Sequence, residues 1–380
     1  MYNYDICLKE HYYLGGNQMD GIINVYKEKG YTSHDVVARL RGITKEKHIG
    51  HTGTLDPAAA GVLPMCLGAV TKACELLTEK GKEYETILLL GIETNTEDAT
   101  GEIVSSGEVE GITDDMIIEA VKSFEGDISQ VPPMFSATRI NGQRYYDLAR
   151  KGVEIDREAK QVHVSNIEII SDSTRCLLSQ KEVFAPYPDT SLAKFAEEPD
   201  PEEGRWHWEN NDIRKDENKD IPVIRVALRI ACEKGTYIRT ICADIGRKLG
   251  CGGCMERLLR TRSGAFTIED SHSLAELEVI FAKVNSEEND NTTSCEKIKN
   301  VLLSADTCFM EYPALHCKEK YDSVLLNGNL MRMRHFKEYI EVADPINRVY
   351  DSHNDFKALY EWVEERKLYR PLKVFISTKE

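Results

Sequence analysis

Apolar positions along the chain recur with two periods, one typical of strands and one typical of helices. Strands are expected at Gly21–Lys27, Gly61–Leu67, Tyr84–Leu90 and Val223–Cys232. Helices are expected after an N-cap at Ser33, from Thr71, over 113–124, and over 238–249, where Gly250 ends the helix. This order of elements predicts an α+β fold with a mixed, mostly antiparallel sheet.

Two later segments refine this picture. In Val223–Cys232 the apolar residues alternate with Arg225 and Arg229, which predicts a strand with one buried and one solvent-facing side. Beyond residue 300, short strand-like runs separated by turn residues predict a small β-rich module. These runs are Tyr339–Val342, Arg348–Tyr350 and Leu372–Ile376.

Polar segments suggest how the chain divides into domains. Between Lys181 and Asp220 twelve acids stand against six bases, and four prolines interrupt any regular element, which predicts a solvated insertion at about 175–220. We therefore expect an N-terminal extension (1–19), a main domain (20–284), a polar linker (285–300) and a C-terminal module (301–380).

Composition excludes some classes of protein. The formal charge of −16 over 380 residues argues against a uniformly basic nucleic-acid binder, although an acidic protein can still carry a basic face. The sequence has no apolar run long enough to span a bilayer and no signal peptide at its start. Eleven cysteines, an odd number, are typical of reduced thiols in a cytoplasmic protein.

Three segments carry a net positive charge, although the net charge of the whole chain is negative. Lys27–Gly50 and Arg139–Lys151 each carry a net charge of +3, and Glu233–Arg262 carries +4. Each window lies beside a glycine-rich loop or a helix start, where phosphates bind readily. The three segments either form one continuous nucleic-acid-binding surface or lie on three separate solvent-facing surfaces. Charge alone does not decide between these alternatives.

The loop Gly50–Pro57 holds the strongest candidate for chemistry. Pro57 keeps Asp56 out of a helix, and Gly50 and Gly53 allow another backbone or a ligand to approach closely. An Asp before Pro is commonly a turn residue. However, His51 and the threonines give this loop more polar side chains than a simple turn requires. Arg239, at a helix start, is either a partner for a carboxylate or a cation that faces a phosphate or solvent.

Metal chemistry has little support. Cys251 and Cys254 have the spacing of a zinc-binding pair, but no second pair or histidines follow at a suitable spacing. No phosphate loop of the Walker type is present. We expect neither a metal nor a cofactor.

Several sequence segments, in the same order along the chain, resemble motifs of the TruB family of tRNA pseudouridine synthases. The resemblance covers about 20–175 and 221–270, and the tail resembles the family's PUA-like C-terminal domain. It rests on these blocks: Gly50–Pro57, Ala60–Pro64, Gly68–Lys72, Lys82–Tyr84, Leu90–Asp98, Gln130–Ala137, Gly142–Gly152, Lys234–Thr240 and Leu258–Phe266.

The resemblance implies that uridine 55 in the T loop of tRNA is isomerised to pseudouridine, without metal or cofactor. It assigns catalytic roles to Asp56, Tyr84, Tyr237 and Arg239, with Asp56 paired to Arg239. His51 and Leu258 would contact the RNA or line the base pocket. The basic residues expected to bind RNA are Arg139, Arg144, Lys72, Lys82 and Arg260.

This sequence departs from the family pattern at four places. Lys27-Glu28 stands where Lys-Pro is usual, Arg139 replaces a lysine, Leu259 an arginine, and Cys254 a histidine. None of these is in the implied catalytic set. The alternative function is an RNA-binding chaperone that folds tRNA without required catalysis. Protein partners are unknown from the sequence.

Overall fold

The computed structural model describes residues 19–134, 139–140, 143–144, 157–177, 221–285, 298, 300–338 and 345–376. Its largest element is an 11-stranded sheet with the order β15-β1-β3-β13-β4-β12-β10-β7, while β2, β11 and β14 pair at its sides. Every pairing in it is antiparallel except that of β13 with β3. Its strands are β1 Gly21–Lys27, β2 Ile49–His51, β3 Ala60–Leu67, β4 Lys82–Leu90, β7 Gly126–Gln130, β10 Lys160–Ile169, β11 Thr174–Leu177, β12 Pro222–Cys232, β13 Gly253–Ser263, β14 Phe266–Thr267 and β15 Leu302–Leu303.

Smaller sheets accompany it. The C-terminal module is a four-stranded sheet of β16 Ala314–His316, β17 Ile346–Tyr350, β18 Phe356–Val363 and β19 Leu368–Val374. Two hairpins are formed by β5 Ile92–Thr94 with β6 Ile103–Ser106, and by β8 Arg139–Ile140 with β9 Gln143–Arg144. The predicted fold class, an α+β main domain with a small β-rich PUA-like module, is confirmed.

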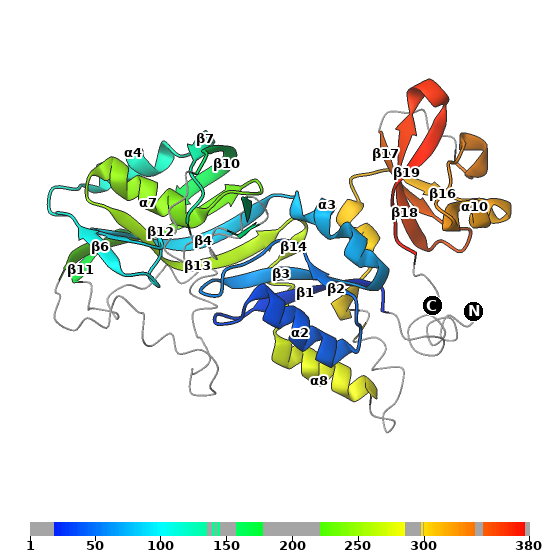
Figure 1. The fold of residues 1–380 in the computed structure, drawn as a ribbon, viewed down its shortest axis with the longest axis horizontal. Helices are drawn as coiled ribbons and strands as arrows, with labels where there is room; N and C mark the ends of the chain where they lie inside the picture. Colours follow the sequence, from blue (N-terminus) through cyan, green and yellow to red (C-terminus); the bar gives the residue numbers. More distant parts are fainter. Residues whose placement is uncertain are drawn as a thin grey trace.

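Helices cover the main sheet at both ends (Figure 1). The α-helices are α2 Ser33–Thr44, α3 Cys74–Thr78, α4 Asp114–Lys122, α7 Ile238–Leu249, α8 Leu274–Asn285 and α10 Asp322–Leu326. The 3-10 helices are η1 Gly68–Ala73, η5 Ala305–Phe309, η6 Glu319–Tyr321, η7 Met333–His335 and η8 Glu364–Arg366. Helices α4 and α7 bury their apolar stripes on β4, β12 and β10, and α2 and α8 pack on β1 and β3.

Strand β1 shows how the C-terminal module is attached. Ile22 and Ile23 are neighbours on a strand, so their side chains lie on opposite faces of the sheet. Ile23 packs in the cluster of α2 and α8, whereas Ile22 packs in a cluster that contains Phe309 and Phe375. The start of the predicted module also enters the main sheet, because β15 pairs with β1. The boundary at 301 stays a prediction.

Two local expectations are wrong. The N-cap of α2 is Thr32 rather than Ser33, because Thr32 and Asp35 form a reciprocal capping box. The first part of β12 is buried on both faces, since Val223 packs in a cluster with Ile92 and Ile103 of the β5–β6 hairpin, whereas Arg229 further along stays partly exposed. There Arg225 is 2% exposed and forms an ion pair with Glu256 at 2.7 Å.

Several expected segments lie outside the described residues: 1–18, most of the acidic insertion, most of the linker, and the strand Tyr339–Val342.

Candidate active site

The loop that carries Asp56 connects β2 to β3 and is fixed by hydrogen bonds on both sides. The Ser33 hydroxyl accepts the Leu55 N–H at 3.0 Å and donates to the Leu55 carbonyl at 3.2 Å. The Gly30 N–H donates to the Pro57 carbonyl at 2.9 Å. Leu55 is buried while Asp56 is not. The loop therefore holds its aspartate at a fixed place on the surface of the fold.

Asp56 and Arg239, 183 positions apart in the sequence, form an ion pair. An Arg239 guanidinium nitrogen lies 3.0 Å from Asp56 Oδ2. The arginine side chain is 6% exposed, whereas the aspartate side chain is 42% exposed. Burial would lower the pKa of Arg239, but the nearby carboxylates of Asp56 and Asp98 raise it overall. The cation is thus buried and permanent, and the carboxylate that it holds stays open to a ligand.

Arg239 reaches this place because α7 begins just before it. Tyr237 is the N-cap residue, in an extended conformation and without a side-chain cap. Gln130 at the end of β7 donates to the Tyr237 carbonyl at 2.9 Å and accepts its N–H at 2.8 Å. This pair of bonds fixes the first turn of the helix, and Tyr237 itself is partly buried beside Arg239.

Asp98 is a second carboxylate in this site, and sequence reasoning gave it no role. Its Oδ2 lies 3.4 Å from an Arg239 nitrogen. Its other oxygen accepts bonds from the Thr96 and Thr100 hydroxyls and from the Thr100 N–H. Asp98 lies within the matched block Leu90–Asp98, which is the signal that could have identified it.

Tyr84 and Leu258 lie on neighbouring strands. Tyr84 pairs with Arg260 across β4 and β13, and Leu258 pairs with Thr86. Both side chains pack at the rim of the cluster that contains Ile238 of α7. Burial raises the pKa of Tyr84, against the opposing effect of Arg260. Tyr84 is therefore a neutral phenol at neutral pH.

Three cations lie beneath the Asp56 loop. Arg260 is 1% exposed and donates to the carbonyls of Val62 at 2.7 Å and Gly53 at 3.3 Å. Burial lowers the pKa of Lys27 to about 7 and that of Lys82 to about 8. A Cβ on Gly61, whose φ is +114°, would lie 2.2 Å from the Arg260 carbonyl, so only glycine allows β3 to approach β13 here.

Two of these cations were expected to bind RNA. The ammonium of Lys82 donates to the carbonyls of Thr78 and Lys80, and the guanidinium of Arg260 donates to backbone carbonyls within the fold. Their assignment as RNA contacts stays a prediction. As placed, Arg260 holds the backbone of the Asp56 loop at Gly53, and Lys82 holds the turn that leads from α3 into β4.

The other predicted residues are spread more widely. His51 ends β2, and burial lowers its pKa. Lys72 is exposed on η1 and donates to the Ile376 carbonyl at 3.5 Å. Arg139 and Arg144 pair across the β8–β9 hairpin, and their side chains lie outside what the structure describes.

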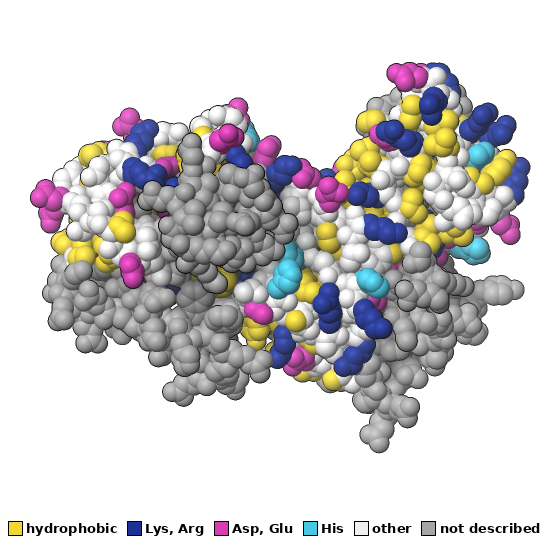
Figure 2. Space-filling view, viewed as in Figure 1, with side chains coloured by type: hydrophobic (Ala, Val, Ile, Leu, Met, Phe, Trp, Pro, Cys, Tyr) yellow, Lys and Arg dark blue, Asp and Glu magenta, His cyan; other side chains and the backbone are white. Residues whose placement is uncertain are grey.

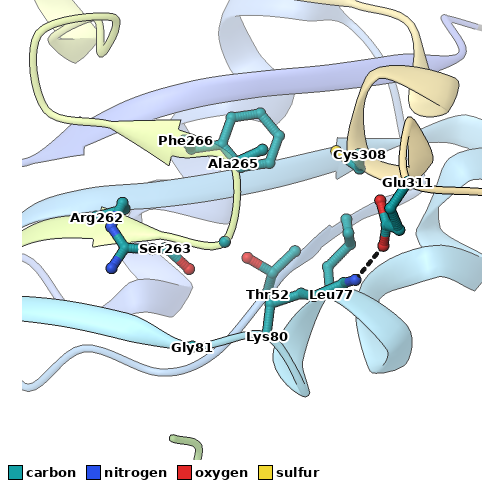
Figure 3. A pocket seen from close by; sticks show the side chains of 11 residues that line it. Thr52, Leu77, Lys80, Gly81, Arg262, Ser263, Ala265, Phe266, Cys308 and Glu311 are labelled. Carbon is teal, nitrogen blue, oxygen red and sulfur yellow. Dashed lines mark hydrogen bonds and ion pairs between the residues drawn. The ribbon is translucent and has the colours of Figure 1, made fainter. Parts of the chain in front are cut away.

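A cavity of about 300 Å³ borders the same loop at Thr52. Figure 3 shows it between the β13–β14 turn and η5, with the Lys80–Glu311 ion pair on one side. None of Asp56, Tyr84, Tyr237 or Arg239 lines it. The Asp56–Arg239 site is thus an open surface site beside the cavity.

The described residues contain no group of three or more His, Cys, Asp or Glu side chains that could hold a metal ion. Cys251 and Cys254 are buried free thiols, and burial raises the pKa of each. A search of the helices in the described part of the chain finds none that is both long and apolar enough to cross a membrane.

Comparison with known proteins gives the family. Residues 41–183 match the model of the N-terminal domain of TruB family pseudouridylate synthases, and 239–310 match that of the tRNA pseudouridylate synthase B C-terminal domain. The chain belongs to the TruB family of pseudouridylate synthases. The predicted resemblance and the predicted enzyme class, an isomerase, are confirmed.

Curated relatives extend over nearly the whole chain. A tRNA pseudouridine synthase B of Lachnoclostridium phytofermentans is 40% identical over 94% of this chain and 100% of its own length. One of Bacillus anthracis is 34% identical over 95% of this chain and 99% of its own length.

Two solved structures of Cbf5 complexes have a fold similar to that of this chain. The chain of a Cbf5-Nop10-Gar1 complex matches with a TM-score of 0.60 at 22% identity, covering 94% of this chain and 85% of that one. An archaeal box H/ACA sRNP Nop10-Cbf5 complex gives 0.59 at 22% identity, covering 95% and 87%. At this identity the likeness describes the fold alone.

Proposed function

We propose that this protein isomerises uridine 55 in the T loop of tRNA to pseudouridine, with Asp56 as the catalytic carboxylate. The observation that carries the proposal is the 3.0 Å ion pair between a half-exposed Asp56 and a buried Arg239. The names of the relatives, each a tRNA pseudouridine synthase B, support tRNA as the substrate. Nine free cysteines in the described part of the chain support a reducing, cytoplasmic setting.

The chemistry needs a base to be released and held. The bond between ribose C1′ and uracil N1 breaks, the base turns over, and a bond forms between C1′ and C5. C5 then loses a proton and N1 gains one, so the product is an isomer of the substrate. An aspartate carboxylate can attack the sugar or remove a proton from it.

The neighbouring side chains suit this reaction. Arg239 fixes the carboxylate so that little reorganisation is needed when the substrate arrives. Tyr84 and Leu258 provide apolar surface against which an extruded uracil can pack. As a neutral phenol, Tyr84 is also a candidate to move the proton from C5.

The test is Asp56→Asn, which keeps the shape of the side chain and removes its charge. We expect no detectable pseudouridine at position 55, while tRNA affinity changes by less than about threefold, because the interaction lost is one made in the transition state. The measurement is chemical mapping of the T loop of an unmodified tRNA transcript, together with a filter-binding assay.

Asp127→Asn is the matched control, because Asp127 is 84% exposed and pairs only with His163 in the described structure. It should retain wild-type turnover. Turnover retained by Asp56→Asn would refute the assigned role, and modification of a uridine elsewhere in the tRNA would refute the proposed position.

A further inference from the structure

Three cysteines of the described chain lie in one apolar cluster, between the main sheet and the start of the C-terminal module. Cys66 in β3 and Cys308 in η5 are buried, whereas Cys74 at the start of α3 is half-buried. Figure 2 shows described side chains, both acidic and basic, at the surface where Figure 1 labels α3. The cluster therefore combines two inner thiols with one thiol that solvent can reach.

Strand β2 places the Cys74 sulfur beside Cys66. Gly50 of β2 is paired with Cys66 of β3. Paired residues of an antiparallel ladder point to the same face of the sheet, with their Cβ positions about 5 Å apart. A Cβ on Gly50 would lie 2.9 Å from Cys74 Sγ. The Cys74 sulfur thus occupies the space that a side chain at position 50 would fill, next to the Cys66 side chain.

Cys66 donates a hydrogen bond to the Cys74 sulfur, and this bond makes the two thiols unequal. It lowers the pKa of Cys74, against the opposing effect of burial. The same bond, together with burial, raises the pKa of Cys66. Because the thiolate is the form that attacks a peroxide, the more exposed and more acidic Cys74 is the sulfur that reacts first. Cys66 is then the sulfur within reach of the product.

We propose that Cys66 and Cys74 form a modification site for hydrogen peroxide, which converts the pair to a reversible disulfide. The Cys74 thiolate attacks one peroxide oxygen, the O–O bond breaks, and the hydroxide that leaves takes up the proton that Cys74 had lost. The Cys66 sulfur then attacks the sulfenic acid on Cys74, the S–S bond forms, and the second hydroxide leaves with the proton of Cys66. Two thiols are oxidised, and one peroxide is reduced to two waters.

The disulfide would pull on the strand that leads to Asp56. Bonded sulfurs are about 2.0 Å apart, closer than two thiols in hydrogen-bond contact. The Gly68 N–H at the start of η1 donates to the His48 carbonyl at 2.8 Å, and the Cys74 sulfur packs closely on Gly50. A movement of this sulfur therefore reaches β2, which continues into the Asp56 loop. A displacement of about 1 Å at a reacting group can slow catalysis about a hundredfold.

The test is mass spectrometry of the folded, reduced, full-length protein after treatment with a molar excess of hydrogen peroxide and removal of the peroxide with catalase. The remaining thiols are alkylated in denaturant before digestion with trypsin. Cleavage after Lys72 separates the two cysteines, so the disulfide links residues 48–72 to residues 73–80. We expect this linked pair, lighter than its separate peptides by two hydrogen atoms, and we expect dithiothreitol to abolish it.

Two serine variants locate the reacting sulfur. Cys74→Ser removes it with little change of shape and should give no linked pair. Cys176→Ser is the matched control, because Cys176 is the other half-buried cysteine of the described residues, and its sulfur accepts a hydrogen bond from Arg225. It should form the linked pair as the wild type does. Absence of the link in the wild type, or a link from residues 48–72 to the peptide that carries Cys308, would overturn the proposal.

A second readout, which rests on the proposed function, is pseudouridine formation on saturating tRNA. Oxidation should lower the wild-type rate roughly tenfold and dithiothreitol should restore it, whereas Cys74→Ser should stay within about twofold of its untreated rate. An unchanged wild-type rate, or equal losses in the wild type and Cys74→Ser, would overturn the coupling of the disulfide to the Asp56 loop. If the reduced wild type formed no pseudouridine, the proposed function would fail while the peptide assay still decided the modification site.

Discussion

A buried lysine next to the Asp56 loop gives the protein a pH-dependent stability. Lys27 is fully buried, and its ammonium donates to the carbonyls of Glu28 at 3.0 Å and Tyr31 at 2.8 Å. Burial lowers its pKa from 10.5 to about 7. Between these values the unfolded chain binds more protons than the folded one, so the free energy of unfolding rises with pH across this window.

Replacing this lysine should remove that dependence. In Lys27→Met the free energy of unfolding should rise less steeply between pH 7 and pH 10 than in the wild type, by up to about 1.4 kcal/mol per pH unit. The measurement is urea unfolding at a series of pH values. Lys47→Met, at an exposed position, should keep the wild-type slope. Overlapping slopes for Lys27→Met and the wild type would contradict the account.

Single residues also mark the limits of prediction from sequence. The pairing of Asp56 with Arg239 was predicted because both lie in recognisable family blocks, not because any periodicity links residues 183 positions apart. The burial of Lys27 and Arg260 was not predicted, since a cation whose charge is met by backbone carbonyls leaves no partner in the sequence pattern. Asp98 was overlooked because its threonine partners are local and resemble a turn.

At the level of elements, two adjacent residues at the start of α2 have different structural roles. Thr32 caps the helix, and Ser33 binds the backbone of Leu55, next to Asp56. The sequence could not separate them, because Ser and Thr are both favoured N-cap residues. Elements with a long apolar stripe, such as α7 and β4, were predicted well because their burial follows directly from the pattern.

This division predicts different effects of two similar substitutions. Thr32→Ala and Ser33→Ala should each lower the free energy of unfolding by about 1 kcal/mol, through loss of a cap and of a buried hydrogen-bonding hydroxyl. Only Ser33→Ala should also reduce the rate of pseudouridine formation, by roughly tenfold, because Asp56 loses its fixed position. Single-turnover kinetics on saturating tRNA would measure this. Equal rates in the two variants would show that Ser33 does not position the loop.

At the level of the whole molecule, aromatic packing joins the C-terminal module to the main sheet. Phe375 stacks on Phe309 of η5, with centroids 6.3 Å apart, and contacts Phe356 of β18 at 5.3 Å. These rings belong to the same buried cluster as Ile22 of β1. On the surface, Lys373 of β19 pairs with Glu75 of α3 at 3.1 Å.

Phe375→Ala should therefore loosen the module while leaving Asp56 untouched. We expect a loss of about 3 kcal/mol in the free energy of unfolding, the usual effect of removing a buried ring. Turnover on a saturating T-arm hairpin should not change. Leu326→Ala, at a 44% exposed position in the same module, is the control and should be nearly neutral. Calorimetry and hairpin kinetics test both points, and a fall in hairpin turnover would place the module within the catalytic site.

The short connection between β15 and β16 fixes the C-terminal module relative to the main sheet. Residues 304–313 include η5, which is packed into the core, so the module has no free tether on which to swing. The distance from Asp56 to the C-terminal sheet is therefore set by the fold. If the proposed function is correct, an RNA that contacts both would have to match this distance, and a change in the length of its stem would weaken its binding.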